Sequence, residues 1–329
     1  MKVSIVLPVY NGDETLRECL SAIAKIDYPK KDFELIVVND GSKDKSHEII
    51  EEFIKKSKGG LTVKYINLKK NVGRIKARLA GVEAANFDNL LFIDHRGRVH
   101  EDIINKIEEK DYQPIVGNLY QNKRESLIGN FFYVLRRIIY YPYWGEDFED
   151  VYITKENFDQ IAKGFCPFFC KRDLLVRNIP KEKGKNVSDD TLIFSNIVKE
   201  KKILKTSECK VEYSERNIGE GFFGHLFHRG PRFVHFYFPK NLKYKLMILL
   251  LAISPIAFMV GMAMVIVLPF LAYIVLGILL SGGVLLSLKY KLSFLDILVF
   301  AVLSPIILSV FALGICKGLV LKILGSLSS

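Results

Sequence analysis

The chain has 329 residues, half of them hydrophobic, and its formal net charge is +11. This length allows one large domain or two ordinary ones. No nucleic-acid-binding motif accompanies the positive charge, so we expect a lysine-rich surface beside anionic lipid rather than a nucleic-acid partner.

Strand and helix patterns alternate over the first hundred residues. The N-terminus, MKVSIVLPVYNGDE, is short, alternating and soon polar, and it predicts a strand rather than a signal peptide. A helix capped by Asp13 follows, with apolar residues at helical spacing. The predicted strands cover residues 3–7, 33–38, 61–67 and 89–94, and the other predicted helices lie around 49–54 and over 73–85. This alternation predicts an α/β fold with a mostly parallel sheet and helices on both faces.

Polar, turn-forming or aromatic residues follow all four predicted strands, at the edge where such sheets bind ligands. The contents suit a nucleotide. Tyr10 can lie against a flat base, Asp40 can accept from a base N–H or a ribose hydroxyl, and Gly41 and Gly73 permit close backbone approach. The alternative is that Asp40-Gly41-Ser42 forms only a turn and a helix cap.

A cationic helix start follows Gly73, with Arg74, Lys76 and Arg78. These side chains can lie near phosphate, or they can form a solvated helix face. Both interpretations stay open for each single residue.

The stretches VSIVLPVYNGDETLRECL, VVNDGSKD, NVGRIKARLAGVEAA and LLFID, in this order and spacing, resemble the N-terminal half of family 2 glycosyltransferases. The resemblance covers roughly residues 1–100. It implies a GT-A nucleotide-diphospho-sugar transferase fold, with a Rossmann-like, mostly parallel sheet. It also implies that the base and ribose of a nucleotide sugar, most often UDP-linked, bind at Pro8, Tyr10 and Asp40. From the same motifs we add the candidate binding residues Asn11, Asn71, Gly73 and Arg78.

The stretch FIDHRGRVH, residues 92–100, ends the fourth predicted strand. The resemblance implies that Asp94 is the first acid of an Asp-x-Asp element, which binds Mg²⁺ or Mn²⁺ on the sugar diphosphate. Arg96 stands where the second acid is expected. Either Asp94 alone, with His95 or a later residue, holds the metal, or Arg96 itself neutralises the leaving diphosphate. We therefore expect weakened but not abolished metal dependence.

The second half resembles the family more loosely. The stretch VSDDTLIF, residues 187–194, lies where membrane-bound members carry an acidic general base, which removes the proton of an acceptor hydroxyl during attack. We assign this role to Asp190 in preference to Asp189. The alternative is capping of a helix N-terminus by one of these acids. The stretch KGFCPFFCKRDLL, residues 163–175, resembles the segment beneath the acceptor site. We interpret Cys166 and Cys170 there as reduced strand residues.

Residues 246–288 carry no charge, and residues 292–316 carry only Asp296. These runs predict a transmembrane region over 246–324 with about three helices, at 246–265, 268–288 and 294–316. We expect the turn between the first two helices near residues 261–269.

A basic, aromatic segment over residues 221–245 precedes the apolar runs and predicts an amphipathic interfacial element. Within it, Arg229, Arg232 and Phe233 match the spacing of the family's Gln-x-x-Arg-Trp element, with Arg for Gln and Phe for Trp. The resemblance implies a place near acceptor and diphosphate. The alternative is an interfacial role alone.

Lysines flank the apolar runs. The positive-inside rule places Lys240, Lys243, Lys245, Lys289 and Lys291 in the cytoplasm, together with a catalytic domain over residues 1–220. Two further lysines, Lys317 and Lys322, fit less well, because an odd number of spans would put them outside.

The leading hypothesis is a membrane-anchored, inverting glycosyltransferase at the cytoplasmic membrane face. It would move a sugar from a UDP-linked donor to a lipid-linked or glycan acceptor in cell-surface polysaccharide or glycoconjugate synthesis. A rival is a non-catalytic, nucleotide-binding membrane scaffold, which the missing second acid favours. A nucleotidyltransferase is a third alternative, although VYNGDE is not a glycine- and arginine-rich phosphate loop.

Overall fold

The structure is a computed structural model, which describes residues 1–57, 60–120, 126–180, 189–214, 222–267 and 281–324. The chain divides into two compact units. The first comprises Met1–Asn122, Pro142–Pro180 and Asp189–Glu215, and the second comprises Lys123–Tyr141, Lys181–Ser188 and Arg216–Ser329. The domain limits at residues 220 and 245 stay predictions.

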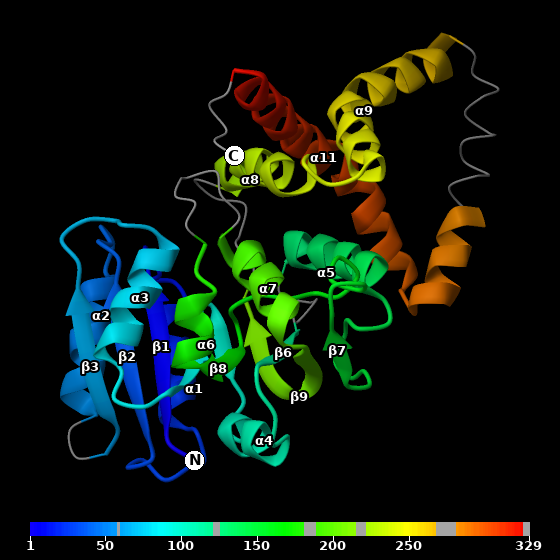
Figure 1. Cartoon of the computed structure of the whole chain (residues 1–329). Helices are drawn as coiled ribbons and strands as arrows, with labels where there is room; N and C mark the ends of the chain where they lie inside the picture. The colour runs from blue at the N-terminus through cyan, green and yellow to red at the C-terminus, as the bar shows by residue number, and fades with distance from the viewer. Residues whose placement is uncertain (58–59, 121–125, 181–188, 215–221, 268–280, 325–329) are drawn as a thin grey trace. The chain divides into compact units, whose positions relative to one another are not determined.

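The first unit contains a nine-stranded sheet whose N-terminal part is parallel (Figure 1). Four strands lie side by side in the order β3-β2-β1-β4, and all their pairings are parallel. Their bounds are Val3–Val9 for β1, Phe33–Asn39 for β2, Thr62–Asn67 for β3 and Asn89–Phe92 for β4. β1, β2 and most of β4 are buried, as expected for parallel strands that are covered on both faces. The predicted strands are therefore confirmed.

Beyond β4 the sheet is mixed. β8 pairs antiparallel with β4, β6 pairs antiparallel with β8, and β9 runs parallel to β6, while β5 and β7 pair antiparallel with β9. Their bounds are Gly97–Val99 for β5, Ile115–Tyr120 for β6, Val151–Ile153 for β7, Phe168–Lys171 for β8 and Ile203–Tyr213 for β9. Cys170 lies in β8 as predicted. The prediction for Cys166 is wrong, because this residue precedes a cis bond to Pro167 and β8 starts only at Phe168.

Helices cover both faces of the parallel strands. Their bounds are Leu16–Ala24 for α1, Ser46–Lys56 for α2, Arg74–Ala84 for α3, Ile103–Glu109 for α4, Arg172–Arg177 for α6 and Asp189–Glu200 for α7. Alternate β1 residues such as Ile5 and Leu7 share one core with α1, α2 and α4. On the other face α3 packs closely, because a Cβ at Gly81 would stand 2.6 Å from Val6.

The first helix begins differently from the expectation. α1 has Thr15 at its N-cap, and no side chain caps it. The predicted cap by Asp13 is wrong. The backbone N–H of Asp13 is instead held by the Asp44 carboxylate at 3.0 Å, which ties the loop before α1 to the loop before α2.

The second unit is helical in its described part. Its helices are α5 (Leu127–Tyr140), α8 (Phe222–Tyr237), α9 (Leu242–Val267) and α11 (Phe294–Ile323), and residues 281–290 are also helical. α11 packs against α5, where the Phe131 and Phe300 rings stack 5.0 Å apart. It also crosses α8 so closely that Gly230 and Gly314 leave no room for a Cβ. Small residues at a helix crossing let the two backbones approach in this way.

Two helices in the described residues are long and apolar enough to cross a membrane, over Leu242–Met264 and Phe294–Ile323. The first predicted span, 246–265, lies within α9 and the third, 294–316, lies within α11. Residues 268–280 of the second predicted span lie outside the described residues. α9 continues through Gly261 to Val267, so no turn occurs before that residue. The charge of Asp296 belongs to a capping box with Ser293 at the start of α11.

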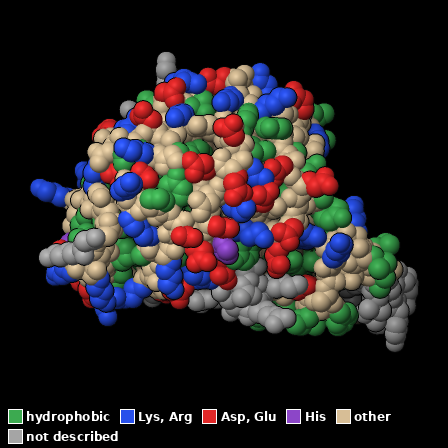
Figure 2. All heavy atoms as spheres, turned by 90° about the horizontal axis from the view of Figure 1, so that it is seen from below, with side chains coloured by type: hydrophobic (Ala, Val, Ile, Leu, Met, Phe, Trp, Pro, Cys, Tyr) green, Lys and Arg blue, Asp and Glu red, His purple; other side chains and the backbone are tan. Residues whose placement is uncertain are grey.

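The net positive charge is not gathered in one place on the face shown in Figure 2. On the face shown in Figure 2, acidic and basic side chains are interspersed, and no single basic patch stands out. All five cysteines are free thiols, as expected for a reducing compartment.

Candidate functional site

The loops that follow β1, β2 and β3 are joined by hydrogen bonds. The Asn11 N–H donates to Ser42 Oγ at 3.0 Å, and the Lys43 N–H donates to Asn11 Oδ1 at 2.9 Å. Asn11 has a φ of 49°, in the left-handed region that Asn tolerates better than most residues. The Asn11 side chain therefore holds the first two loops together. Beside it, Tyr10 is 43% exposed, so its ring is available for stacking.

Asp40 joins the second loop to the third. The side chain is buried, and its two oxygens accept from the backbone N–H groups of Val72 at 2.7 Å and Gly73 at 3.1 Å. Burial raises the pKa of Asp40, and these two hydrogen bonds oppose that rise. Each carboxylate oxygen can still accept a second hydrogen bond from a ligand N–H or hydroxyl. Asp40 does not cap α2, which begins at Ser46.

The two loop glycines have different surroundings. Gly41 has a φ of +67°, and a Cβ there would stand 2.5 Å from the Lys70 carbonyl carbon. It therefore lets the second loop approach the backbone of the third. Gly73 has a φ of +91° and open space where a Cβ would be. Pro8 is the residue before last of β1, and Asn71 is exposed in the third loop.

Asp94 follows β4 by two residues and its side chain is 39% exposed. Its Oδ1 accepts from the Arg96 N–H at 3.2 Å and lies 3.8 Å from His95 Nε2. The His95 ring is buried against Gly12, with Nδ1 3.1 Å from Thr15 Oγ1. Among the described residues, the Arg96 guanidinium makes no hydrogen bond or ion pair.

The residues around Asp94 give a limited metal site. No group of three or more His, Cys, Asp or Glu residues in the described part of the chain could hold a metal ion. Mg²⁺ on a nucleotide, however, commonly takes only one or two protein carboxylates, with phosphate oxygens and waters completing its shell. Asp94 fits as the single protein carboxylate of such a site.

Asp190 lies in the first turn of α7. Its Oδ1 accepts from Arg78 Nη1 at 2.6 Å, and Arg74 Nη1 lies 3.6 Å from its Oδ2. The structure thus brings together the predicted base and the predicted cationic start of α3. Sequence analysis missed this ion pair, because no local pattern links residues 112 positions apart. Asp189 begins α7, and its side chain lies outside the described set.

The remaining predicted site residues, Arg229, Arg232 and Phe233, lie on α8 in the second unit. The Phe233 ring packs against Phe311 of α11, with ring centroids 5.6 Å apart. A role for these three residues near acceptor and diphosphate stays a prediction.

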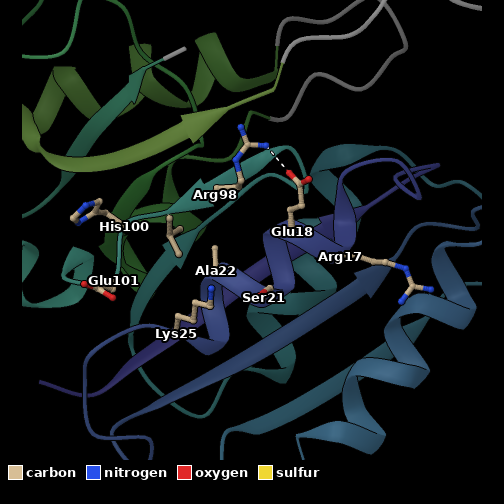
Figure 3. Close-up of a pocket in the computed structure, with 9 residues that line it drawn as sticks. Arg17, Glu18, Ser21, Ala22, Lys25, Arg98, His100 and Glu101 are labelled. Carbon is tan, nitrogen blue, oxygen red and sulfur yellow. Dashed lines mark hydrogen bonds and ion pairs between the residues drawn. The ribbon is translucent and has the colours of Figure 1, made fainter. Parts of the chain in front are cut away.

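A separate pocket of about 530 Å³ lies between α1 and β5 (Figure 3). It includes Arg98 and His100 from the FIDHRGRVH stretch. Arg98 donates to Glu18 at 2.7 Å, and Arg17 donates to Glu52 at 2.7 Å. Arg98, Glu18 and Arg17 in the pocket lining are therefore engaged in ion pairs within the protein.

The family model for glycosyl transferase family 2 matches residues 4–171 of the chain, about half of its length. The chain belongs to glycosyl transferase family 2. The match contains every candidate residue from Pro8 to Arg96. Asp190 and α8 lie beyond it.

Curated relatives share this N-terminal region. The chain is 33% identical over 162 residues to glycosyltransferase GlyA of Streptococcus pneumoniae, covering 47% of this chain and 22% of that protein. It is 36% identical over 112 residues to the poly(ribitol-phosphate) beta-N-acetylglucosaminyltransferase TarS of Staphylococcus aureus, covering 34% of this chain and 18% of that protein. The chain thus spans about a fifth of the length of these two relatives.

Solved structures confirm the GT-A fold. A crystal structure of S. aureus TarS in complex with UDP-GlcNAc has a TM-score of 0.52 at 19% identity, covering 71% of this chain and 67% of that one. The mannosyltransferase PcManGT from Pyrobaculum calidifontis, in complex with GDP-Man and Mn²⁺, has a TM-score of 0.60 at 17% identity, covering 97% of this chain and 87% of that one. At these identities the likeness establishes the fold.

Proposed function

We propose that this chain is a membrane-anchored, inverting glycosyltransferase that uses a nucleotide-sugar donor, with UDP as the preferred nucleotide. One observation carries the proposal. The loops joined through Asn11 and Asp40 lie in the same unit as an acidic side chain, Asp190, that is held in place by Arg78. The relatives' names and the UDP-GlcNAc and GDP-Man complexes of the structural neighbours support sugar transfer from such a donor.

The proposed reaction is a single displacement. Tyr10 stacks on the base, and Asp40 accepts from a base N–H or a ribose hydroxyl. The acceptor hydroxyl oxygen attacks the anomeric carbon while Asp190 takes its proton. The bond from that carbon to the diphosphate oxygen breaks, and the nucleoside diphosphate leaves with the electron pair. Attack opposite to the leaving group inverts the anomeric carbon.

The leaving diphosphate needs positive charge. Arg96 is suited to this task, because a guanidinium binds phosphate oxygens bidentately. A divalent metal, when bound, would neutralise charge on the diphosphate, and Asp94 is the residue that would hold it. Mn²⁺ in the PcManGT complex supports this possibility for the fold.

The acceptor and membrane assignments also belong to the proposal. α9 and α11 anchor the chain, and residues 1–220 form a cytoplasmic catalytic domain that is joined to residues 246–324 by an interfacial segment over 221–245. The acceptor is a lipid-linked molecule or a glycan of the cell surface, with Arg229, Arg232 and Phe233 on its side. The apolar lengths of α9 and α11 support this anchoring.

A donor screen tests the proposal. Full-length protein in lipid nanodiscs is incubated with UDP- and GDP-linked sugars and lipid-linked acceptors, and released nucleotide is measured. We expect transfer from one donor, and a loss of about 10²- to 10⁴-fold for Asp190→Asn with UDP binding retained. Lys106→Gln, which alters a surface ion pair within α4, is the matched control. Wild-type protein that neither transfers sugar nor binds UDP or GDP contradicts the proposal.

The same assay tests the metal. We expect EDTA to slow transfer without abolishing it, because Arg96 supplies charge where a second acid is absent. Complete loss that Mn²⁺ restores would show that the metal, rather than Arg96, neutralises the leaving group.

A further inference from the structure

Arg78 is held in an unusually fixed environment within the first unit. The side chain is 8% exposed, and its Cζ lies 4.0 Å from the centre of the Phe165 ring. Its Nη1 donates to Asp190 Oδ1 at 2.6 Å. A guanidinium stacked on an aromatic face is restricted to that plane. The stacking therefore fixes the direction in which Arg78 offers its hydrogen bond.

Phe165 also contacts the helix that carries Asp190. Its ring centroid lies 5.3 Å from that of Phe194, which is one turn further along α7, and 5.1 Å from that of Phe168 on β8. The Phe165 ring thus packs against α7, which carries Asp190, and against Arg78, which binds the Asp190 carboxylate. Asp190 is thus held through α7 and through Arg78, and Phe165 contacts both.

The second arginine of α3 contacts Asp190 more weakly. Arg74 is 52% exposed and its Nη1 lies 3.6 Å from Asp190 Oδ2, against 9% side-chain exposure and 2.6 Å for Arg78. An exposed, longer pair contributes little to orientation. Arg78 is therefore the residue that sets the carboxylate direction.

We propose that Arg78 is a positioning residue for Asp190, rather than a ligand of the donor diphosphate. Clamped over Phe165, it keeps the carboxylate in one orientation for proton removal from the acceptor hydroxyl. This inference rests on the proposed function. It differs from the expectation that Arg78 binds the nucleotide sugar. Under the inference, Gly73 at the start of α3 lies on the donor side, and Arg78, just over one turn later, acts on the acceptor side.

The two roles give different kinetics. We expect Arg78→Gln to lower kcat about 10- to 100-fold, because a misplaced catalytic group costs this much. The donor KM and the UDP dissociation constant should change less than about twofold, since uniform donor binding is untouched. Arg78→Lys should recover part of kcat. The acid limb of the kcat pH profile should move to higher pH in Arg78→Gln, because a nearby cation favours the carboxylate form.

Phe165→Leu is the second variant, which removes the stacking and leaves the guanidinium in place. It should lower kcat less than Arg78→Gln does, again at constant donor KM. It also keeps the inference testable if Arg78→Gln fails to fold. Lys106→Gln is again the control, with kcat and KM as in the wild type.

Different failures are distinguishable. A rise of tenfold or more in donor KM and UDP dissociation constant, with kcat unchanged, would make Arg78 a donor ligand and overturn the inference alone. Unchanged kinetics in both variants, beside an inactive Asp190→Asn protein, would also overturn it alone. A wild-type protein without transfer from any donor would remove the proposed function, and the inference with it.

Discussion

Arg96 and Arg98 stand two residues apart, but their charges are used differently. Arg98 donates to Glu18 at 2.7 Å and Ser214 at 2.6 Å and lies 3.3 Å from Glu212, so it links α1 to β9. His100 pairs with Asp102 at 2.8 Å. In the described structure Arg96 alone of the three has no such polar partner for its side chain. The positive charge of Arg98 is therefore structural, and that of Arg96 is available to a ligand.

The buried Lys205 makes the free energy of unfolding depend on pH. Its Nζ donates to the Gly117 carbonyl at 2.6 Å, and burial lowers its pKa from 10.5 to about 7. Between pH 7 and 10.5 the unfolded chain thus binds more protons, so the free energy of unfolding rises with pH in this window. The full rise is at most about 5 kcal/mol. Below pH 7 both states are charged and this contribution no longer varies.

Thermal unfolding checks this prediction. The fluorescence of Trp144, the chain's one tryptophan and a buried one, can follow the first unit from pH 7 to 10. Lys205→Met should lose the extra rise in melting temperature with pH that the wild type shows. Lys210→Met, at a surface ion pair, should keep it. Identical pH slopes in wild type and Lys205→Met would refute the buried-lysine contribution.

The candidate site residues that could be predicted from the sequence are those close to local motifs. Asn11, Asp40 and Asp94 each follow a strand whose apolar run is visible in the sequence, and the parallel sheet brings their loops together. The pairing of Arg78 with Asp190 could not be predicted, because it depends on Phe165 packing between α3 and α7. Such packing has no periodic signature in one sequence.

At the scale of elements, α3 connects the two ends of the candidate site. The N–H groups just before it bind Asp40, and Arg78 within it binds Asp190. Its far end is held by Arg172, whose Nη1 donates to the Val82 carbonyl at 2.6 Å and whose Nη2 donates to those of Ala85 at 2.6 Å and Phe87 at 3.1 Å. One side chain thus satisfies three carbonyls at and after the end of α3.

Replacing Arg172 by Met should therefore destabilise the first unit. We expect the free energy of unfolding to fall by about 2–3 kcal/mol, because three carbonyls lose a charged donor. Urea denaturation of the full chain, followed by Trp144 fluorescence, measures the change. Arg177→Met, which breaks only exposed ion pairs, one within α6 and one from α6 to the end of α7, should cost less than about 1 kcal/mol. Equal losses in the two variants would show that the carbonyl contacts contribute nothing specific.

The strands also show which elements a sequence reveals. β1 to β4 appear in the sequence as apolar runs between helical patterns. β5 and β7 have three residues each and pair with β9, far away in the chain. Elements this short carry no usable period, and long-range pairing alone defines them. Beyond β4, strand residues were predicted only at Cys166 and Cys170, of which Cys170 lies in β8, and none of β5, β6, β7 and β9 was predicted.

At the scale of the whole molecule, the lysines of the second unit constrain the membrane topology. Lys322 Nζ lies 5.8 Å from the Phe238 ring and Lys317 Nζ lies 5.2 Å from the Phe227 ring. Lys245 is also near Phe238, at 5.7 Å. The end of α11 and the start of α9 therefore lie at the same end of the second unit. If α9 and α11 cross a membrane as proposed, this placement predicts an even number of crossings between them, in place of the three expected from the sequence.

Cysteine labelling tests this topology. On a Cys316→Ser background, we expect Lys245→Cys and Lys322→Cys to react with a membrane-impermeant maleimide from the same side. Inverted vesicles should expose both residues, and right-side-out vesicles should protect both. Asp13→Cys, in the first unit, marks the cytoplasmic side of the proposal. Labelling of positions 245 and 322 from opposite sides would restore an odd number of crossings.

The contact of Gly230 with Gly314 also determines when α8 can complete its packing during synthesis of the chain. α8 leaves the ribosome before α9, and α11 follows both, so the surface of α8 around Gly230 stays uncovered until α11 has been made. In the proposed membrane-anchored enzyme, α11 would therefore also cover α8, besides attaching the chain to a bilayer. The candidate acceptor residues of α8 reach their final surroundings only after α11 has been made.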